Sequence, residues 1–421
     1  MDVRQCNKRN YSLRIRGVLV LRILVLNHFP TIFPPNTGGV LRYFHLYNEL
    51  SKFYDITLLS QKYTPELEII EYSHSFREYK IPVNDIQNKI DEKLINDNVG
   101  PRFSTHAALS CALMDKPPAL FLKYYKQFYN KTDIVIHESP FLLNYDIYFD
   151  LDNKPRIYNS HNHESEFAKR VWKGKNSHKY IEHVTLLEKT LVQNATLVFA
   201  TSKEEKENFI KTFNVDRSKI KLAPNGILPE EWNQRINNSK TNSKFTAFFI
   251  GSMHQPNIDI VNFIDSELSA ECKNIDFLIA GQCGNGFSSP GNENIKFLGE
   301  IDQKKKLDFF SNVDIAINPA FFGTGTKIKT LEFLSAGIPL ISTDVGVKGM
   351  RLINGTHYIH ATHKNFAQSL NRVLKDKALL RKISTNGQKY VNQLYSWKTI
   401  AKKVEKQISV TQNKVSNSNL L

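Results

Sequence analysis

The sequence predicts an α/β protein of two Rossmann-like, doubly wound domains that face each other across a cleft. Apolar runs of four to eight residues alternate with helical patterns, which is typical of parallel βα units. With 421 residues, the chain is long enough for two domains of about 200 residues each. A turn cluster at Leu222–Gly226 and the polar stretch Asn233–Lys244 divide the alternation into two series. Open sheets of this kind bind ligands at the carboxyl ends of their strands, hence the expected cleft.

The first series begins with the apolar run Gly17–Leu26, which contains Arg22. A membrane-spanning helix needs about 20 apolar residues, so this run is too short. Basic residues precede it, as in a signal peptide, but no small-residue cleavage site follows, and we interpret it as a buried strand. A helix is expected at Val40–Phe53, and residues 60–130 show helical patterning without a clear strand. The expected strands of this half are Arg22–Asn27, Asp55–Leu59, Ile134–Ile136, Arg156–Asn159 and Leu197–Ala200.

The second series repeats the alternation after the polar stretch. Its expected strands are Phe245–Gly251, Ile275–Gly281, Ile295–Phe297, Asp314–Asn318 and Pro339–Thr343. The chain then continues as helices, expected at Asn365–Leu374, Lys377–Tyr395 and Trp397–Gln407, and ends in a polar tail.

The net charge of +15 lies at the two ends of the chain. Residues 1–22 contribute +5 and residues 372–421 contribute +9, so the centre is almost neutral. Basic termini favour attraction to a polyanionic surface such as anionic lipid. The alternative is that they are solvated tails that keep the protein soluble. Nucleic acid is not expected as a partner, because few aromatic residues are interleaved with the basic ones.

The four cysteines are scattered as Cys6, Cys111, Cys272 and Cys283, without a CxxC pair. This spacing favours free thiols in a reducing compartment over a disulfide framework or a zinc site. His161, His163 and Glu164 could be read as a metal cluster, but no distant third ligand suggests itself. We therefore expect no metal and a cytoplasmic protein.

The segment Gly323–Glu332 carries the strongest functional signal. Its glycines, at Gly323 and Gly325 beside Thr324 and Thr326, run into a helix whose first turn holds Lys327 and Lys329. Lysines there oppose the helix dipole, and glycines leave backbone N–H groups uncovered. A bound phosphate or pyrophosphate would account for both features. The alternative is a solvated strand-to-helix loop.

Other glycine-rich turns follow expected strands. Gly38-Gly39 precedes the first helix, Gly251-Ser252 and Gly281 follow strands of the second half, and each could line a nucleotide or be a structural turn. The sequence contains neither GxGxxG after its first strand nor GxxxxGK[ST]. A dinucleotide oxidoreductase and a P-loop enzyme are therefore disfavoured.

Taken together, these motifs resemble the GT-B glycosyltransferases, in particular the retaining glycosyltransferase family 4. The similarity covers roughly residues 21–408 and is strongest in GTGTKIKTLEFLSAGIPLISTDVGVKG at Gly323–Gly349. Matching segments also include ATLVFATS at Ala195–Ser202, the hinge Pro224-Asn225-Gly226, FIGSMHQPN at Phe249–Asn257 and the closing Tyr395-Ser396-Trp397.

The resemblance implies a domain plan. A basic extension at 1–20 would precede an acceptor domain at 21–226 and a nucleotide-sugar donor domain at 227–394. A helix at 395–408 would return to the first domain, and a polar tail would follow at 409–421. No cofactor is implied, since the nucleotide-diphosphate sugar is a co-substrate.

The resemblance also implies roles for single residues. Glu332 matches the acid that holds the ribose hydroxyls, although it could instead pair with Lys329 at i,i+3. Lys327 and Lys329 would neutralise the departing diphosphate. Gly38 and Gly39 match the loop that approaches the diphosphate and acceptor. His161 matches the histidine that contacts the donor sugar, and the alternative is an inert loop histidine.

The sequence departs from the family pattern at one position. Thr324 stands eight residues before Glu332, where the usual E-x7-E motif has its first glutamate. A branch with a GTGTK-like loop would fit this chain, with the lysines supplying the missing charge. An arginine expected after the first strand of the second domain is also replaced, with Ser252 in that neighbourhood.

The function implied is sugar transfer from a nucleotide-diphosphate donor to a hydroxyl of a glycan or lipid-linked glycan, with retained anomeric configuration, in polysaccharide biosynthesis. The location implied is the cytoplasm, with peripheral attachment to the membrane if the basic ends bind anionic lipid. Two alternatives stay open: a sugar-nucleotide epimerase of the same fold, and a catalytically silent basic glycan-binding relative.

Overall fold

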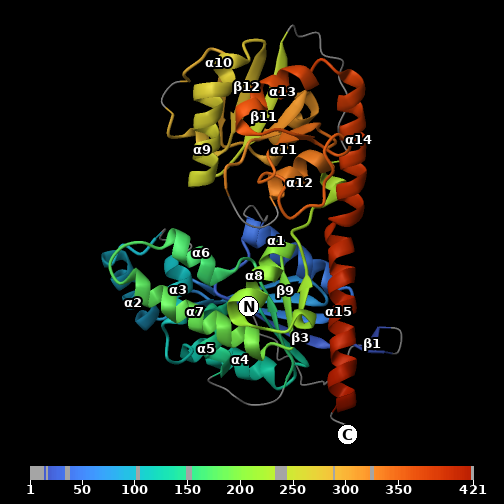
Figure 1. The fold of residues 1–421 in the computed structure, drawn as a ribbon. Coiled ribbons are helices and arrows are strands. Elements are labelled where there is room, and N and C mark those ends of the chain that lie inside the picture. Colours follow the sequence, from blue (N-terminus) through green and yellow to red (C-terminus); the bar gives the residue numbers. More distant parts are fainter. Residues whose placement is uncertain are drawn as a thin grey trace, which may run out of the picture. The chain divides into compact units, whose positions relative to one another are not determined.

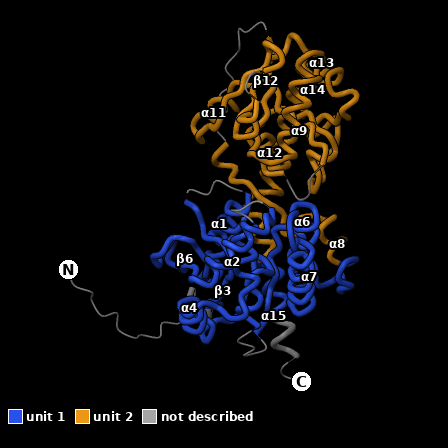
Figure 2. The backbone as a smooth tube through the Cα atoms, turned by 90° about the vertical axis from the view of Figure 1, so that its left-hand side faces the viewer, with its two compact units in different colours: residues 1–199, 210–221, 405–421 blue, residues 200–209, 222–404 orange. Residues whose placement is uncertain are grey.

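The computed structural model describes residues 14–15, 18–33, 38–100, 105–147, 154–232, 244–287, 290–322 and 327–418. The chain forms two compact units, coloured separately in Figure 2. Unit 1 contains residues 1–199, 210–221 and 405–421, and unit 2 contains residues 200–209 and 222–404. Figure 1 labels the elements of both units. Each unit has its own largely parallel sheet with helices, which confirms the predicted fold class.

The sheet of unit 1 has the strand order β10-β9-β8-β7-β3-β4-β6-β5 in the described residues. From β6 to β9 this is the doubly wound order 3-2-1-4-5-6, with parallel pairing throughout. Its strands are β3 (Arg22–Asn27), β4 (Asp55–Lys62), β5 (Glu68–Ser73), β6 (Phe76–Pro82), β7 (Ile134–His137), β8 (Arg156–Asn159), β9 (Leu197–Ala200) and β10 (Ile220–Leu222).

Helices connect these strands. Helix α2 begins with a capping box, in which the Asn84 and Gln87 side chains each accept from the other's backbone N–H. The helices before β10 are α1 (Gly38–Leu50), α2 (Asp85–Asn96), α3 (Ala107–Ala112), α4 (Ala119–Tyr129), α5 (Leu143–Ile147), α6 (Glu164–Val171), α7 (Ser177–Asn194) and α8 (Lys203–Phe213), with short turns η2 (Pro140–Leu142) and η3 (Arg217–Lys219).

Two expectations for this half were wrong. Residues 60–130 contain the hairpin β5–β6, whose strands pair antiparallel at the sheet edge. Side chains of β5 alternate between half-buried and exposed, so the strand has no continuous apolar run and was missed. The run Gly17–Leu26 is not one strand, because β2 (Val18–Leu19) pairs with β1 (Arg14–Ile15) and ends before β3 begins.

The sheet of unit 2 has the order β13-β12-β11-β14-β15-β16 in the described residues, again 3-2-1-4-5-6, and every pairing is parallel. Five of the strands lie where apolar runs predicted them, and the two-residue β16 was missed. The strands are β11 (Phe245–Ile250), β12 (Ile275–Ala280), β13 (Ile295–Gly299), β14 (Ile315–Asn318), β15 (Leu340–Ser342) and β16 (Ile359–His360).

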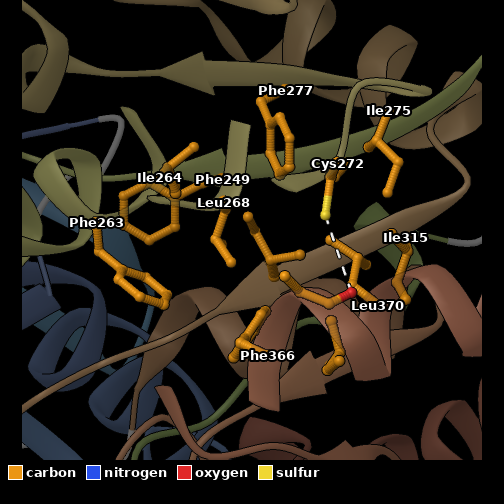
Figure 3. Close-up of a cluster of buried hydrophobic side chains, with 14 of the residues drawn as sticks. Phe249, Phe263, Ile264, Leu268, Cys272, Ile275, Phe277, Ile315, Phe366 and Leu370 are labelled. Atoms are coloured by element: carbon orange, nitrogen blue, oxygen red, sulfur yellow. Dashed lines mark hydrogen bonds between the residues drawn. The ribbon is translucent and has the colours of Figure 1, made fainter. Parts of the chain in front are cut away.

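The core of unit 2 is apolar and densely aromatic. Figure 3 shows Phe249 and Phe277 from the sheet together with Phe366 and Leu370 from α13. The remaining elements are α9 (Gln255–Phe263), the π-turn η5 (Ile264–Leu268), α10 (Ser269–Glu271), α11 (Gln303–Asn312), α12 (Ile328–Ser335), α13 (Phe366–Val373), α14 (Lys377–Leu394) and α15 (Trp397–Ser418), with η4 (Pro229–Glu231), η6 (Gln282–Gly284) and η7 (His363–Asn365).

The last helix is longer than expected. Helix α15 continues to Ser418, so the expected tail at 409–421 is largely helical. Its apolar positions Ile400, Val404 and Ile408 are buried, and this stripe supports the helix. Near its middle, the Tyr54 hydroxyl of unit 1 donates to the Glu405 carbonyl at 3.4 Å.

Of the helices that the structure describes, none is long and apolar enough to cross a membrane. Cys111, Cys272 and Cys283 are buried free thiols, whereas Cys6 lies outside the described residues.

Candidate functional site

Each sheet changes its winding direction at one place. In unit 1 this switch point lies between β3 and β7, and in unit 2 between β11 and β14. Loops that leave neighbouring strands in opposite directions open a crevice at the carboxyl ends of those strands. The described site residues follow strands at or next to these switch points, or lie near the start of a helix, so each unit carries one cluster.

In unit 2 the two lysines lie at the start of α12. Lys327 is the N-cap and Lys329 is the second helical residue, and the first turn holds no acid. Lys329 Nζ donates to Asn257 Oδ1 at 2.7 Å and lies 4.2 Å from the centroid of the Phe249 ring. Its hydrogen-bond partner is thus a neutral amide, and the face of the Phe249 ring adds a cation–π contact.

Burial makes both ammonium groups easy to deprotonate. It lowers the pKa of Lys329 to about 7. Burial, together with the charge of Lys348, lowers the pKa of Lys327 to about 8. An anion placed beside these groups would favour their charged form, so the site is electrostatically suited to a phosphate.

Two predicted glycines lie around Asn257, where close packing leaves no room for a side chain. A Cβ on Gly251 would lie 2.8 Å from Asn257 Cγ. Gly281 has φ +87°, and a Cβ on it would lie 2.2 Å from the Gly251 carbonyl oxygen. Asn257 Nδ2 also donates to the Ser252 carbonyl oxygen at 3.0 Å. Asn257 therefore contacts Gly251, Ser252 and Lys329, and Gly281 packs against Gly251.

Glu332 lies one turn beyond Lys329 and is 9% exposed. Its Oε2 forms an ion pair with Lys306 Nζ of α11 at 2.7 Å. The expected alternative, an ion pair with Lys329, is wrong, because the lysine that pairs with Glu332 comes from another helix. Lys306 Nζ also lies 5.1 Å from the centroid of the Trp232 ring. Burial and the nearby Glu332 carboxylate raise the pKa of Glu231.

Four predicted residues, Gly323, Thr324, Gly325 and Thr326, lie outside the described residues. Their roles, and the replacement of the usual glutamate by Thr324, stay predictions. Just before them, the Phe321 ring stacks on His363 at 3.8 Å between centroids.

In unit 1, Gly38 and Gly39 begin α1, and His161 follows β8. Gly38 is exposed. A Cβ on Gly39 would lie 3.5 Å from His161 Nδ1 and 3.4 Å from Phe29 Cζ. The structure therefore places Gly39 directly against the predicted histidine.

His161 is bonded to a buried acid that the sequence did not single out. Its Nε2 lies 2.6 Å from Oε2 of Glu138, which follows β7 and has no exposed surface. Nearby, His28 Nδ1 lies 3.0 Å from Ser139 Oγ. Burial lowers the pKa of His28 to about 3, so His28 is neutral.

His163, the second histidine of the suggested metal cluster, has a structural role. Its Nδ1 lies 3.1 Å from Glu188 Oε2, which also accepts the backbone N–H of Ser165 at 2.8 Å. Among the described residues, no three His, Cys, Asp or Glu side chains are grouped so that they could hold a metal ion. The absence of a metal stays a prediction.

Sequence reasoning missed Glu138, Asn257 and Lys306. Glu138 could have been found, because a polar residue directly after a buried strand is a candidate for a site at a sheet edge. Asn257 is the third residue of α9 and follows Pro256, in a segment already noted for its resemblance. Lys306 lies in the lysine-rich start of α11 and carries no local signal.

Comparisons with known families cover most of both units. The family described as glycosyltransferase family 4 matches residues 37–231, and the one described as glycosyl transferases group 1 matches residues 244–376. The chain belongs to the family 4 glycosyltransferases. The finer assignment, to a branch with a GTGTK-like loop, stays a prediction.

Individual relatives of this glycosyltransferase are distant. It is 26% identical over 231 residues to an uncharacterized glycosyltransferase of Methanocaldococcus jannaschii, a match that covers 49% of this chain and 57% of the relative. The match thus spans little more than half of that relative's length.

Solved structures share the fold over nearly the whole chain. Sucrose-phosphate synthase from Thermosynechococcus elongatus superposes with a TM-score of 0.67 at 14% identity, covering 94% of this chain and 100% of that one. Anabaena HepE in complex with UDP and glucose gives a TM-score of 0.64 at 13% identity, covering 93% and 100%. At these identities the likeness establishes the GT-B fold.

Proposed function

We propose that this glycosyltransferase transfers a sugar from a nucleotide-diphosphate donor to an acceptor hydroxyl with retained anomeric configuration. The observation that carries the proposal is the pair Lys327 and Lys329 at the start of α12. Two half-buried ammonium groups at a helix N-terminus, without an acid in the first turn, form a site for a polyanion.

The remaining residues of unit 2 account for the rest of a nucleotide. Glu332 has a carboxylate that can accept hydrogen bonds from two ribose hydroxyls. Its ion pair with Lys306 holds the carboxylate in place before the ligand arrives. Gly251 and Gly281 let the ends of β11 and β12 pack closely against each other and against Asn257, the residue that accepts a hydrogen bond from Lys329. UDP, which is bound in the HepE structure, is our first choice of nucleotide.

The proposed chemistry depends on the leaving group. As the bond between the anomeric carbon and the diphosphate oxygen breaks, negative charge grows on the diphosphate. Lys327, Lys329 and the N–H groups of α12 would stabilise that charge, so the reaction would not need a divalent metal. The departing diphosphate would take the proton of the acceptor hydroxyl on the same face, and this gives retention. Protein catalysis then consists mainly of positioning and leaving-group stabilisation.

The test is a screen of UDP-, GDP- and ADP-linked sugars by thermal shift, followed by assays for released nucleotide diphosphate with glycan acceptors. We expect one nucleotide class to raise Tm, because ligands that bind only the folded state stabilise it. NMR of the product's anomeric proton would then report the configuration. Absence of a Tm shift with every donor would contradict the proposal, and an inverted product would contradict retention alone.

For the acceptor, we propose a glycan or lipid-linked glycan at an anionic membrane surface on the cytoplasmic side. The support is the basic surface of α15. Lys398, Lys402 and Lys406 are exposed at i,i+4 spacing, opposite the buried Val404. Among the described residues, these lysines form no ion pair. Exposed lysines near an anionic surface each contribute about 1 kcal/mol of attraction.

Liposome co-sedimentation tests this surface. Changing Lys398, Lys402 and Lys406 to Glu should abolish binding to anionic vesicles at low salt, and high salt should weaken wild-type binding. The control changes Lys89, Lys123 and Lys131, exposed lysines of unit 1, to Glu, which alters the net charge equally. Equal loss in both variants would show that only net charge matters.

A further inference from the structure

We infer that Glu138 is a positioning residue that fixes the tautomer and orientation of His161, so that Nδ1 is the ring atom directed at the substrate. This inference rests on the proposed function, in which His161 contacts a sugar. It adds the buried acid Glu138 next to the histidine. Nε2 of His161 would donate to this acid, and Nδ1 would contact the substrate.

The first step is the bond between the two side chains. His161 Nε2 lies 2.6 Å from Glu138 Oε2. The His161 side chain is 12% exposed and that of Glu138 is fully buried. An ionised carboxylate can only accept hydrogen bonds, so Nε2 must carry the hydrogen. In the neutral imidazole, Nδ1 is then left as an acceptor.

The second step is that Glu138 is itself held. Its other oxygen, Oε1, accepts from the Tyr47 hydroxyl and, at 2.8 Å, from Asn159 Nδ2. Asn159 Oδ1 in turn accepts from Arg42 Nη2 at 2.9 Å, and all three partners are buried. Tyr47 and Asn159 therefore both donate to the carboxylate. The network leaves Glu138 in one orientation and supplies a nearby positive charge.

The third step is the direction of Nδ1. A Cβ built on Gly39 would lie 3.5 Å from His161 Nδ1, so this nitrogen faces the first turn of α1 at the switch point of the sheet. Gly39 presents no side chain there. An imidazole whose N–H is bonded to a carboxylate is a stronger acceptor at its other nitrogen. Nδ1 can thus accept a hydrogen bond from a sugar hydroxyl.

Another His–Glu pair among the described residues provides a matched control. His163 Nδ1 lies 3.1 Å from Glu188 Oε2, and that carboxylate is also fully buried. It accepts the backbone N–H groups of Glu164 and Ser165, so its task is to cap α6. Both pairs join a histidine to a fully buried carboxylate, but it is His161 of the Glu138 pair that lies against Gly39.

The experiment combines ring ¹⁵N NMR with kinetics. In the wild-type protein, the His161 signals, assigned with His161→Asn, should show a protonated Nε2 and an unprotonated Nδ1. In Glu138→Gln the tautomer should change, and kcat should fall about 10- to 100-fold with an unchanged KM for the donor. Glu188→Gln should lower Tm and leave kcat within about twofold of the wild type.

The outcomes separate this inference from the proposed function. A protonated Nδ1 in the wild-type protein would overturn the inference even if Glu138→Gln did not fold. Wild-type kcat in a folded Glu138→Gln variant would also overturn it. If no donor supports transfer, the proposed function fails, whereas the NMR result still decides the tautomer.

Discussion

Each unit has one buried carboxylate in its candidate site, Glu332 in unit 2 and Glu138 in unit 1. The two carboxylates have different kinds of partner. Glu332 of unit 2 pairs with a lysine at 2.7 Å and keeps some exposure. Glu138 of unit 1 is fully buried and is surrounded by His161, Tyr47 and Asn159, which donate hydrogen bonds. The ion pair of Glu332 keeps a little solvent exposure, whereas the carboxylate of the Glu138 network has none.

The comparison indicates that the two units suit different chemical groups. Unit 2 provides the ammonium groups of Lys327 and Lys329 and the carboxylate of Glu332, which suit a nucleotide diphosphate. Unit 1 offers one oriented imidazole, which suits a sugar hydroxyl. Nucleotide affinity should therefore depend on unit 2 and hardly on Glu138.

The largest expected effect is the loss of both lysines. Lys327→Ala combined with Lys329→Ala should weaken UDP binding by about 100-fold, because each charge-assisted hydrogen bond contributes about 1.5 kcal/mol or more. Calorimetry measures this directly. The control replaces Lys304 and Lys305, exposed lysines of α11, with Ala. Unchanged UDP affinity in the Lys327/Lys329 variant would contradict the proposal that these two lysines bind the diphosphate.

A smaller effect is expected for Glu332→Gln. Loss of the ribose acceptor should weaken UDP binding by about tenfold, while inorganic pyrophosphate, which has no ribose, should bind as before. Glu138→Gln should leave UDP affinity unchanged. An equal loss of affinity for UDP and for pyrophosphate would mean that Glu332 does not bind the ribose and affects binding only through the charge of the lysines.

The smallest effect is expected for Lys306→Met, which keeps an apolar stem beside Trp232. A partly exposed ion pair contributes about 1 kcal/mol or less, so UDP affinity should fall by at most about fivefold. The same substitution in the Glu332→Gln background should have no further effect, since Lys306 acts through Glu332. Additive losses in this double-mutant cycle would show that Lys306 contacts the nucleotide itself.

Much of the fold was predictable, because a strand that is buried on both faces appears in the sequence as a continuous run of apolar residues. β3, β8 and β9 match their predicted bounds, and β11 and β12 each end one residue before theirs. The β5–β6 hairpin was not predictable in this way, since half of the β5 side chains are exposed and charged residues interrupt the apolar ones in β6.

The candidate site was predictable only where its residues are close to one another in the sequence. Lys327, Lys329 and Glu332 share one helix start, so their spacing was visible. Their partners are distant in the sequence, since Asn257 and Lys329 are 72 positions apart and Glu138 and His161 are 23 positions apart. Only the folded sheets bring such residues together.

The central claim is that Lys327 and Lys329 receive the diphosphate, and proton uptake on binding tests it most directly. In the free protein the pKa of Lys329 is about 7 and that of Lys327 about 8. At pH 8 these groups are therefore partly or mostly neutral, whereas UDP is fully ionised. A bound diphosphate raises both pKa values, so binding takes up protons and affinity falls as pH rises from 7 to 9.

Calorimetry of UDP binding at pH 8, in buffers of different ionisation enthalpy, gives the number of protons taken up. We predict on the order of one proton per nucleotide in the wild-type protein, and none when Lys327 and Lys329 are replaced by Ala. UDP binding without proton uptake, or equal uptake in the variant, would contradict the account.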